Sequence, residues 1–121
     1  MKDCLFCKII NNEIPSYTLY EDDIVKVFLD IDPKSNGHTL IIPKKHFIDL
    51  DDIDQETLNH IFSVAKKIKK ELEEKLQPTG ITLVQNNGSI QEVKHYHLHL
   101  IPAYLNNKID DVKEVYKKIS E

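Results

Sequence analysis

The chain of 121 residues has few glycines and cysteines, and their positions exclude several common kinds of site. Gly37, Gly80 and Gly88 lie too far apart to form a G-x-G-x-x-G or Walker A loop, so any nucleotide chemistry needs another device. Cys4 and Cys7 are the only cysteines and form a single C-x-x-C, which excludes a disulfide framework.

Long apolar runs and clusters of basic residues are also missing. No apolar run approaches the ~18 residues that a membrane span needs, and residues 1–13 lack the apolar stretch and cleavage site of a signal peptide. The formal net charge is −4 with Lys, Asp and Glu interspersed, and this balance disfavours a nucleic-acid surface. We therefore expect a cytoplasmic protein without a membrane or nucleic-acid partner.

Strands are predicted from short runs of β-branched, aromatic and alternating residues. Residues 18–29 predict a hairpin around an acidic turn, and residues 39–43 predict a third strand that ends at a proline. Two further strands are predicted near residues 81–85 and 95–101. Together they predict a mainly antiparallel five-stranded sheet.

Helices are predicted in two segments, whereas the N-terminal segment is expected to be poor in helix. Apolar residues recur at helical spacing over residues 54–77, and residues 108–121 predict a short amphipathic helix. We expect a single α+β domain spanning residues 1–121, with the long helix covering one face of the sheet. The predicted buried stripe of that helix consists of Leu58, Ile61, Phe62, Ala65, Ile68, Leu72 and Leu76.

Three histidines alternate with apolar residues in the segment KHYHLHLIP, residues 94–102. On a strand the rings of His95, His97 and His99 project from one face, because side chains alternate, whereas a helix would scatter them. The pattern leaves three interpretations open: a polar, solvent-exposed strand face, a zinc site with an open position, or a nucleophilic imidazole flanked by hydrogen-bond donors.

This segment resembles the signature of the histidine triad (HIT) family. The blocks LFCKIINNEIPSY, YEDDIVKVFLDIDP, GHTLIIPKKH and QNNGS also resemble the other motifs of the family, in the same order, between about residues 4 and 103. The resemblance implies an α+β domain that forms a homodimer through a continuous sheet. It also implies a nucleotide hydrolase that attacks the α-phosphate of purine nucleoside phosphoramidates or related conjugates.

The same resemblance implies a different role for each histidine near the phosphate. His97 matches the nucleophile, which forms a transient nucleotidyl-histidine; His99 matches a residue that hydrogen-bonds a phosphate oxygen. His38 matches a fourth histidine that lies against the triad. An ordinary imidazole pKa of ~6.5 suits this chemistry, because it leaves one ring nitrogen unprotonated at pH 7. The alternative function, which is not enzymatic, is that of a nucleotide-binding module with little or no catalysis.

The resemblance further implies a nucleotide pocket. Asp30 matches a carboxylate that accepts hydrogen bonds from ribose hydroxyls, although by position alone it could simply end a strand. Asn86 and Gln91 match polar residues near the phosphates. A base pocket is implied for five apolar residues that composition alone would equally assign to the core. They are Leu5, Phe6, Ile9, Phe28 and Ile31.

The C-x-x-C admits three interpretations: two free thiols, a redox pair, or half of a zinc site. A thioredoxin-like motif needs a preceding strand, for which three residues leave no room. Two thiolates at this spacing provide half of a tetrahedral zinc site. Some HIT proteins and related nucleotidylyltransferases are similar and complete the site with two histidines. The resemblance thus implies structural zinc held by Cys4, Cys7, His46 and His95.

The loop before the triad departs from the family pattern. It is shorter than the loop of many family members. Ile90 stands where glycine is usual in the family, and Glu92 stands where a phosphate-binding Ser or Thr is usual. A carboxylate beside a phosphate is electrostatically unfavourable. We therefore expect either that Glu92 points away from the phosphate or that activity toward ordinary family substrates is reduced. His60, on the long helix outside its apolar stripe, is expected at the surface.

Overall fold

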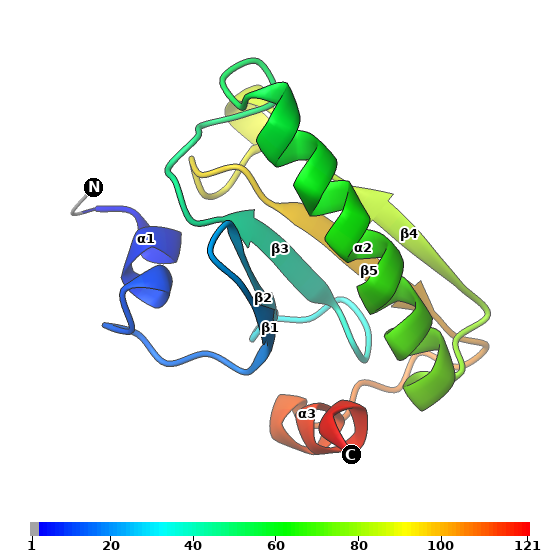
Figure 1. Ribbon diagram of the computed structural model, residues 1–121. Helices are drawn as coiled ribbons and strands as arrows, with labels where there is room; N and C mark the ends of the chain where they lie inside the picture. The colour runs from blue at the N-terminus through cyan, green and yellow to red at the C-terminus, as the bar shows by residue number, and fades with distance from the viewer. Residues whose placement is uncertain (1–2) are drawn as a thin grey trace.

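The computed structural model describes residues 3–121, in which a five-stranded antiparallel sheet is combined with three α-helices (Figure 1). The strands lie in the order β1-β2-β3-β5-β4. The predicted α+β class and antiparallel sheet are therefore confirmed. None of the helices in the described residues has both the length and the apolar character that a membrane crossing requires. The elements in chain order are α1 (Leu5–Ile10), β1 (Thr18–Glu21), β2 (Val25–Leu29), β3 (Thr39–Pro43), α2 (Gln55–Leu76), β4 (Gly80–Val84), a short 3-10 helix (Gly88–Ile90), β5 (Leu98–Ala103) and α3 (Val112–Ser120).

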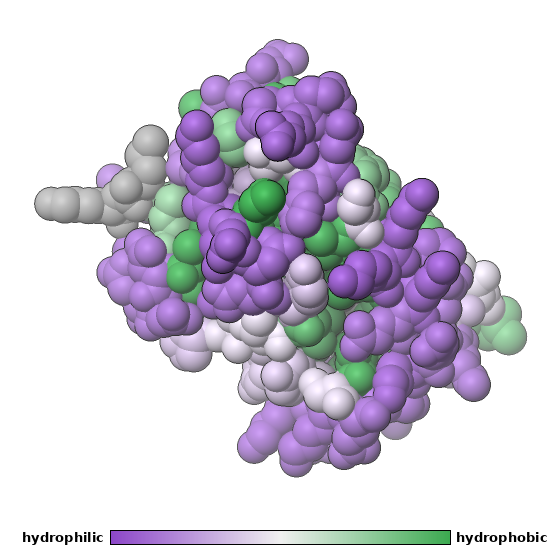
Figure 2. All heavy atoms as spheres, viewed as in Figure 1, coloured by the Kyte–Doolittle hydropathy of each residue, from purple (hydrophilic) through white to green (hydrophobic). Residues whose placement is uncertain are grey.

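Helix α2 crosses one face of the sheet (Figure 1), as the apolar period predicted. It begins after Asp54, whose side chain accepts a hydrogen bond from a backbone N–H, and ends at Gln77 in the left-handed conformation. The prediction for Phe62 was wrong, because its side chain is 43% exposed while Val64 is buried. Each helical residue advances by about 100°, so a stripe centred on Ile61 and Ala65 leaves Phe62 at its edge. Figure 2 shows mainly hydrophilic side chains over the viewed face of α2 and α3.

The N-terminal segment forms the short helix α1, which packs on the opposite face of the sheet from α2. The expected lack of helix there was therefore wrong; six residues are too few for a helical period to stand out in the sequence. Alternate residues of β2 and β3 face α1, so both faces of these strands are buried. The cluster beneath α1 consists of Phe6, Ile9, Phe28, Leu40 and Ile42.

The histidine segment joins the sheet only at Leu98, so His95 and His97 precede β5. Period-two alternation still holds, since Tyr96 and Leu98 pack in the core with α2 while the two histidines contact Phe6 of α1. The expectation of a half-buried strand was wrong for these rings, because His95 is 0% and His97 5% exposed. Helix α1 covers the face that would otherwise meet water.

His60 is not an isolated surface residue, because it links α2 to the β1–β2 turn. Its Nε2 lies 2.7 Å from a carboxylate oxygen of Asp22. Asp22 also accepts hydrogen bonds from the Tyr20 hydroxyl and from the backbone N–H groups of Ile24 and Val25, each at 2.8 Å. Partial burial alone would raise the pKa of Asp22, but these bonds and His60 together hold it well below its usual range.

Candidate active site

Two adjoining cavities open beside the triad, on the face of the sheet that α1 covers. One, the apolar cavity, has a volume of about 240 Å³ and runs along α1. The other, the polar cavity, has a volume of about 160 Å³ and reaches toward β4. Five residues line both: Asp30, Asp32, Glu92, His97 and His99. A ligand with an apolar and a polar part can therefore occupy both cavities across these residues.

The apolar cavity is lined by all five residues expected at a base pocket. Phe6 and Phe28 are buried and meet edge to face, with ring centroids 5.8 Å apart. Leu5 and Ile31 lie at the rim and are 44% and 77% exposed. Phe6 also lies edge-on to His97, with centroids 4.9 Å apart. Ile9 completes the wall, so the slot suits a flat apolar group directly beside the central histidine.

His97 presents an unprotonated ring nitrogen to the cavities. Its Nδ1 lies 2.8 Å from the backbone carbonyl oxygen of His95. A carbonyl oxygen only accepts, so Nδ1 carries the proton and Nε2 keeps its lone pair. Burial lowers the pKa of His97, and this outweighs the opposing effects of the carbonyl and of the carboxylates of Asp30 and Glu92. A neutral imidazole with a free lone pair is chemically able to act as a nucleophile without a separate base.

His38 and His99 form a hydrogen-bonded pair with a defined direction. The backbone N–H of Lys34 donates to Nδ1 of His38 at 3.1 Å, so the proton of neutral His38 is on Nε2. That nitrogen lies 2.9 Å from Nδ1 of His99, which accepts its hydrogen bond, and the proton of His99 is consequently on Nε2. Burial lowers the pKa of both rings, that of His99 to about 4, so both are neutral at pH 7. His99 thus offers an N–H donor.

The residues expected at the metal site lie together at the N-terminal end of α1. Their ligand atoms are all within 4.8 Å of one another; the residues are Cys4, Cys7, His46 and His95. The Nδ1 of His95 lies 3.3 Å from Sγ of Cys4 and 3.1 Å from Nδ1 of His46. Its Nε2 lies 2.8 Å from the carbonyl oxygen of Pro43, which places the proton there and the lone pair toward the thiols.

This donor set fits zinc. Two sulfur and two imidazole ligands suit tetrahedral Zn²⁺, and a second-shell carbonyl orients one of the rings. Burial and the neighbouring Cys4 raise the pKa of the Cys7 thiol to about 11. Burial lowers the pKa of His95 to about 4, which keeps this ring neutral and able to bind metal. A bound cation supplies the positive charge that stabilises the thiolates.

Comparison with known proteins settles the family. The family model of the HIT domain matches residues 11–106. The chain belongs to the histidine triad (HIT) family. An uncharacterized HIT-like protein of Methanocaldococcus jannaschii is 46% identical to this HIT protein over 119 residues, which cover 93% of it and 91% of the relative.

An adenosine 5'-monophosphoramidase of Saccharomyces cerevisiae is 48% identical over 101 residues, which cover 82% of this HIT protein and 61% of the relative. A solved structure of a Zn-bound histidine triad family protein from Mycobacterium smegmatis superimposes with a TM-score of 0.90 at 33% identity. That alignment covers 98% of this HIT protein and 91% of the other chain.

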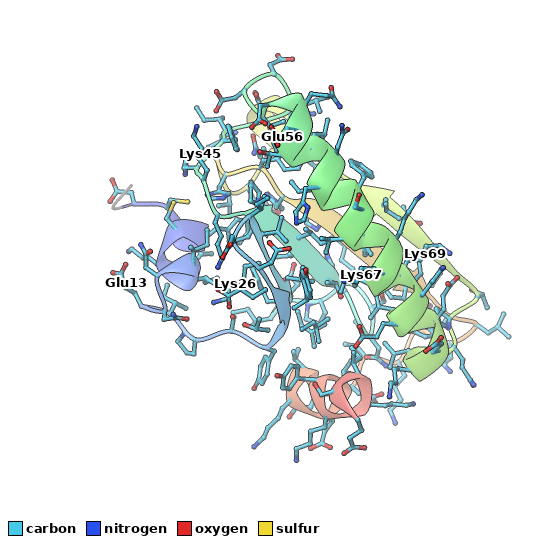
Figure 3. All side chains as sticks on the ribbon, viewed as in Figure 1. Glu13, Lys26, Lys45, Glu56, Lys67 and Lys69 are labelled. Atoms are coloured by element: carbon cyan, nitrogen blue, oxygen red, sulfur yellow. The ribbon has the colours of Figure 1, made fainter. Side chains whose placement is uncertain are left out.

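Lys26 of the HIT protein holds the C-terminal end of α1 and was missed from the sequence. Only 3% of Lys26, which Figure 3 labels, is exposed. Its ammonium donates to the carbonyl oxygen of Ile9 at 3.1 Å and to the side chain of Asn12 at 3.3 Å. Glu21 lies 3.9 Å away. Strand alternation places Lys26 on the same face as Phe28, and this was the one sequence signal that Lys26 lies under α1.

The loop before the triad distributes its polar residues differently from the expectation. Asn86 lines the polar cavity, as its motif suggests. Gln91 lines neither cavity; it is buried, and its amide donates to the carbonyl oxygen of Ile48 at 2.6 Å. Glu92 lines both cavities, and its carboxylate acts to raise the pKa of His97, so the structure brings Glu92 close to the triad. Lys34 lines the polar cavity and supplies a cation there.

Proposed function

We propose that this HIT protein hydrolyses purine nucleoside phosphoramidates or related nucleotide conjugates at the α-phosphate through a nucleotidyl-histidine intermediate. The observation that carries the proposal is the fixed tautomer of His97, a residue that lines both cavities and whose Nε2 is unprotonated. The name of the yeast relative, an adenosine 5'-monophosphoramidase, supports the choice of substrate class.

The two cavities suggest how the substrate is held. The base enters the apolar cavity beside Phe6 and Phe28, and the ribose hydroxyls donate to the carboxylate of Asp30, which lies where the cavities meet. The α-phosphate then lies over His97 with its leaving group in the polar cavity. Asn86 and the backbone of its loop border the phosphate from the other side.

The reaction has two steps. In the first, Nε2 of His97 attacks phosphorus, a nitrogen–phosphorus bond forms, and the bond to the leaving amine breaks as that amine takes up a proton from solvent, which the water of the second step gives back. In the second, water attacks the same phosphorus, releases the nucleoside monophosphate and restores the neutral ring. The Nε2–H of His99 stabilises charge on a phosphoryl oxygen in both steps, and the carbonyl oxygen of His95 stabilises the transient positive charge on His97.

His97→Ala tests this function directly. We expect turnover of adenosine 5'-phosphoramidate to fall by more than about a thousandfold, the scale at which nucleophile removal acts. The Kd for AMP should change by less than about threefold, because the pocket walls remain. Denaturing wild-type reactions at alkaline pH should also trap protein labelled from the α-phosphate, because the phosphorus–imidazole bond is labile in acid but not in alkali. Loss of AMP binding in proportion to the loss of rate, or wild-type protein that returns the substrate unchanged, would instead favour the nucleotide-binding module.

We also propose that zinc at Cys4, Cys7, His46 and His95 is structural. Four protein ligands close a tetrahedral site and leave no position for water or substrate. A zinc hydrolase that used the triad as metal ligands would instead need His97 and His99. Elemental analysis distinguishes the two, since zinc should remain in His97→Ala and be lost from Cys4→Ser.

We further propose that the chain acts as one domain and pairs with a second copy at the edge strand β4. This strand has a neighbour on one side only, and its Leu83 is 39% exposed. An unpaired, partly apolar edge is a ready template for another strand. Light scattering should give a dimer that Leu83→Lys converts to a monomer, with Ile109→Lys, at another exposed apolar residue, as the control.

A further inference from the structure

The direction of the His38–His99 pair depends on the loop formed by residues 30–38. Within this loop the backbone N–H of Lys34 reaches Nδ1 of His38, and the N–H of Asp30 donates to the carbonyl oxygen of His38 at 2.9 Å. These bonds hold the loop to itself and do not attach it to the rest of the domain. The carboxylate of Asp30, 3.7 Å from Nε2 of His38, also favours the proton on that nitrogen. The tautomer of His38 therefore rests on two groups of this loop, the N–H of Lys34 and the carboxylate of Asp30, whose positions depend on how the loop is held.

Three hydrogen bonds supply that support from the segment between β5 and α3. The side chain of Asn36 accepts from the backbone N–H of Asp110 at 2.8 Å and donates to the Asp110 carboxylate at 3.0 Å. The hydroxyl of Tyr104 donates to the carbonyl oxygen of Asn36 at 2.6 Å. We call these three residues the Asn36 clamp. It attaches the loop two residues after Lys34 and two residues before His38.

We propose that Asn36, Tyr104 and Asp110 are positioning residues, which hold the loop so that Lys34 sets the tautomer of His38 and, through it, that of His99. If the loop moves, Nδ1 of His38 loses its donor and can itself carry the proton. Nε2 of His38 then accepts from His99, and the free nitrogen of His99 becomes a lone pair. A lone pair facing a phosphoryl oxygen repels it where the N–H would attract it.

Exchange of the clamp groups tests this proposal. Asn36→Asp places a second carboxylate 3.0 Å from that of Asp110 and removes the amide donor. The double variant Asn36→Asp with Asp110→Asn restores one donor and one acceptor with their positions exchanged. Asp110→Asn alone keeps an acceptor oxygen and serves as the background. Asn107→Asp makes the same substitution in the same segment at an exposed residue and is the matched control.

The first measurement is the protonation of each ring nitrogen, from long-range ¹H–¹⁵N correlation spectra of protein labelled in histidine. In Asn36→Asp the signals of His38 and His99 should change from those of rings protonated at Nε2 to those of rings protonated at Nδ1. The double variant should restore the signals of rings protonated at Nε2. This readout does not need a substrate, so it stands even if phosphoramidates prove not to be hydrolysed. An unchanged pattern in folded Asn36→Asp, or a double variant that fails to restore it, would overturn the proposal.

The second measurement, which rests on the proposed function, is turnover. The kcat of Asn36→Asp should fall about fivefold, the effect of about one ordinary hydrogen bond lost in the transition state, with KM changed less than about twofold. The double variant should recover most of the loss, and Asn107→Asp should match the wild type. If Asn36→Asp does not fold, Tyr104→Phe removes one bond of the clamp without adding charge, and its ring-nitrogen pattern decides in the same way.

Discussion

Removal of zinc should weaken nucleotide binding, because α1 carries residues of both sites. Cys4 and Cys7 lie at its N-terminal end, while Phe6 and Ile9 of the same helix line the apolar cavity. A helix of six residues is not stable in water by itself. Its position therefore depends on the metal cluster at one end and on Lys26 at the other.

The magnitude follows from what remains when the metal is gone. Ordering six residues costs about 1 kcal/mol each at the low end of the usual range. Burial of Phe6 and Ile9 offsets about 2 kcal/mol each, and the hydrogen bonds of Lys26 offset about 1 kcal/mol together. The ordered form of α1 is then about 1 kcal/mol less stable than the disordered form, so only about one molecule in six is competent to bind, and the Kd for AMP should rise about sixfold.

Calorimetric titration of AMP into zinc-loaded and chelator-treated protein measures this change. Linkage requires that saturating AMP raise the zinc affinity by the same factor, which competition with a chromophoric chelator can check. Lys26→Met should weaken AMP binding without changing zinc stoichiometry. Lys69→Met, at an exposed lysine of α2, should change neither AMP binding nor zinc stoichiometry (Figure 3). An AMP affinity that stays within twofold after complete zinc removal would refute the reasoning.

Three further predictions concern other parts of the domain. Glu92→Gln should raise turnover of an uncharged-amine phosphoramidate about threefold or more, because it removes a carboxylate beside the phosphate; lower turnover in steady-state assays would contradict this. Gly37→Ala should lower the free energy of unfolding in urea by about 3 kcal/mol, because φ is +87° and the added methyl would lie 2.5 Å from a Leu76 carbon. Gly88→Ala, with φ +78° and open space around it, should lower it by about 1 kcal/mol. The lowered pKa of Asp22 contributes stability that is complete above its unfolded pKa of ~3.9 and is lost as pH falls below it, so Asp22→Asn should flatten that acid limb.

The sequence predicted the strands and α2 because their signals are local. The β-branched and aromatic residues of β2, the alternation over β5 and the helical period after Asp54 are all signals within one segment of the chain. Phe62 shows the limit of such signals. A buried stripe that includes Phe62 and one that includes Val64 instead contain similar numbers of apolar residues, so the period alone does not choose between them. Helix α1 was missed because six residues show no clear helical period and because its position depends on contacts at its two ends, with the C-x-x-C cluster and with Lys26.

The residues of the candidate site that belong to motifs were predictable from the sequence. The contacts between loops that are distant in the sequence were not. The proximity of Cys4 and His95 follows from the family resemblance, although 91 residues separate them. The burial of Gln91 against Ile48 and the contact of Asn36 with Asp110 have no local signal, because each joins loops whose paths depend on the whole fold. Tautomers likewise depend on neighbouring backbone groups that a sequence does not display.

The three histidines of the triad differ in whether another residue can replace them. A glutamine amide can place an N–H near the position of a histidine Nε2, so it can reproduce what His99 offers. No amide nitrogen has the lone pair that His97 presents, and an amide is a poor zinc ligand at His95. Replacement of His99 by glutamine should therefore reduce activity less than replacement of His97 by glutamine.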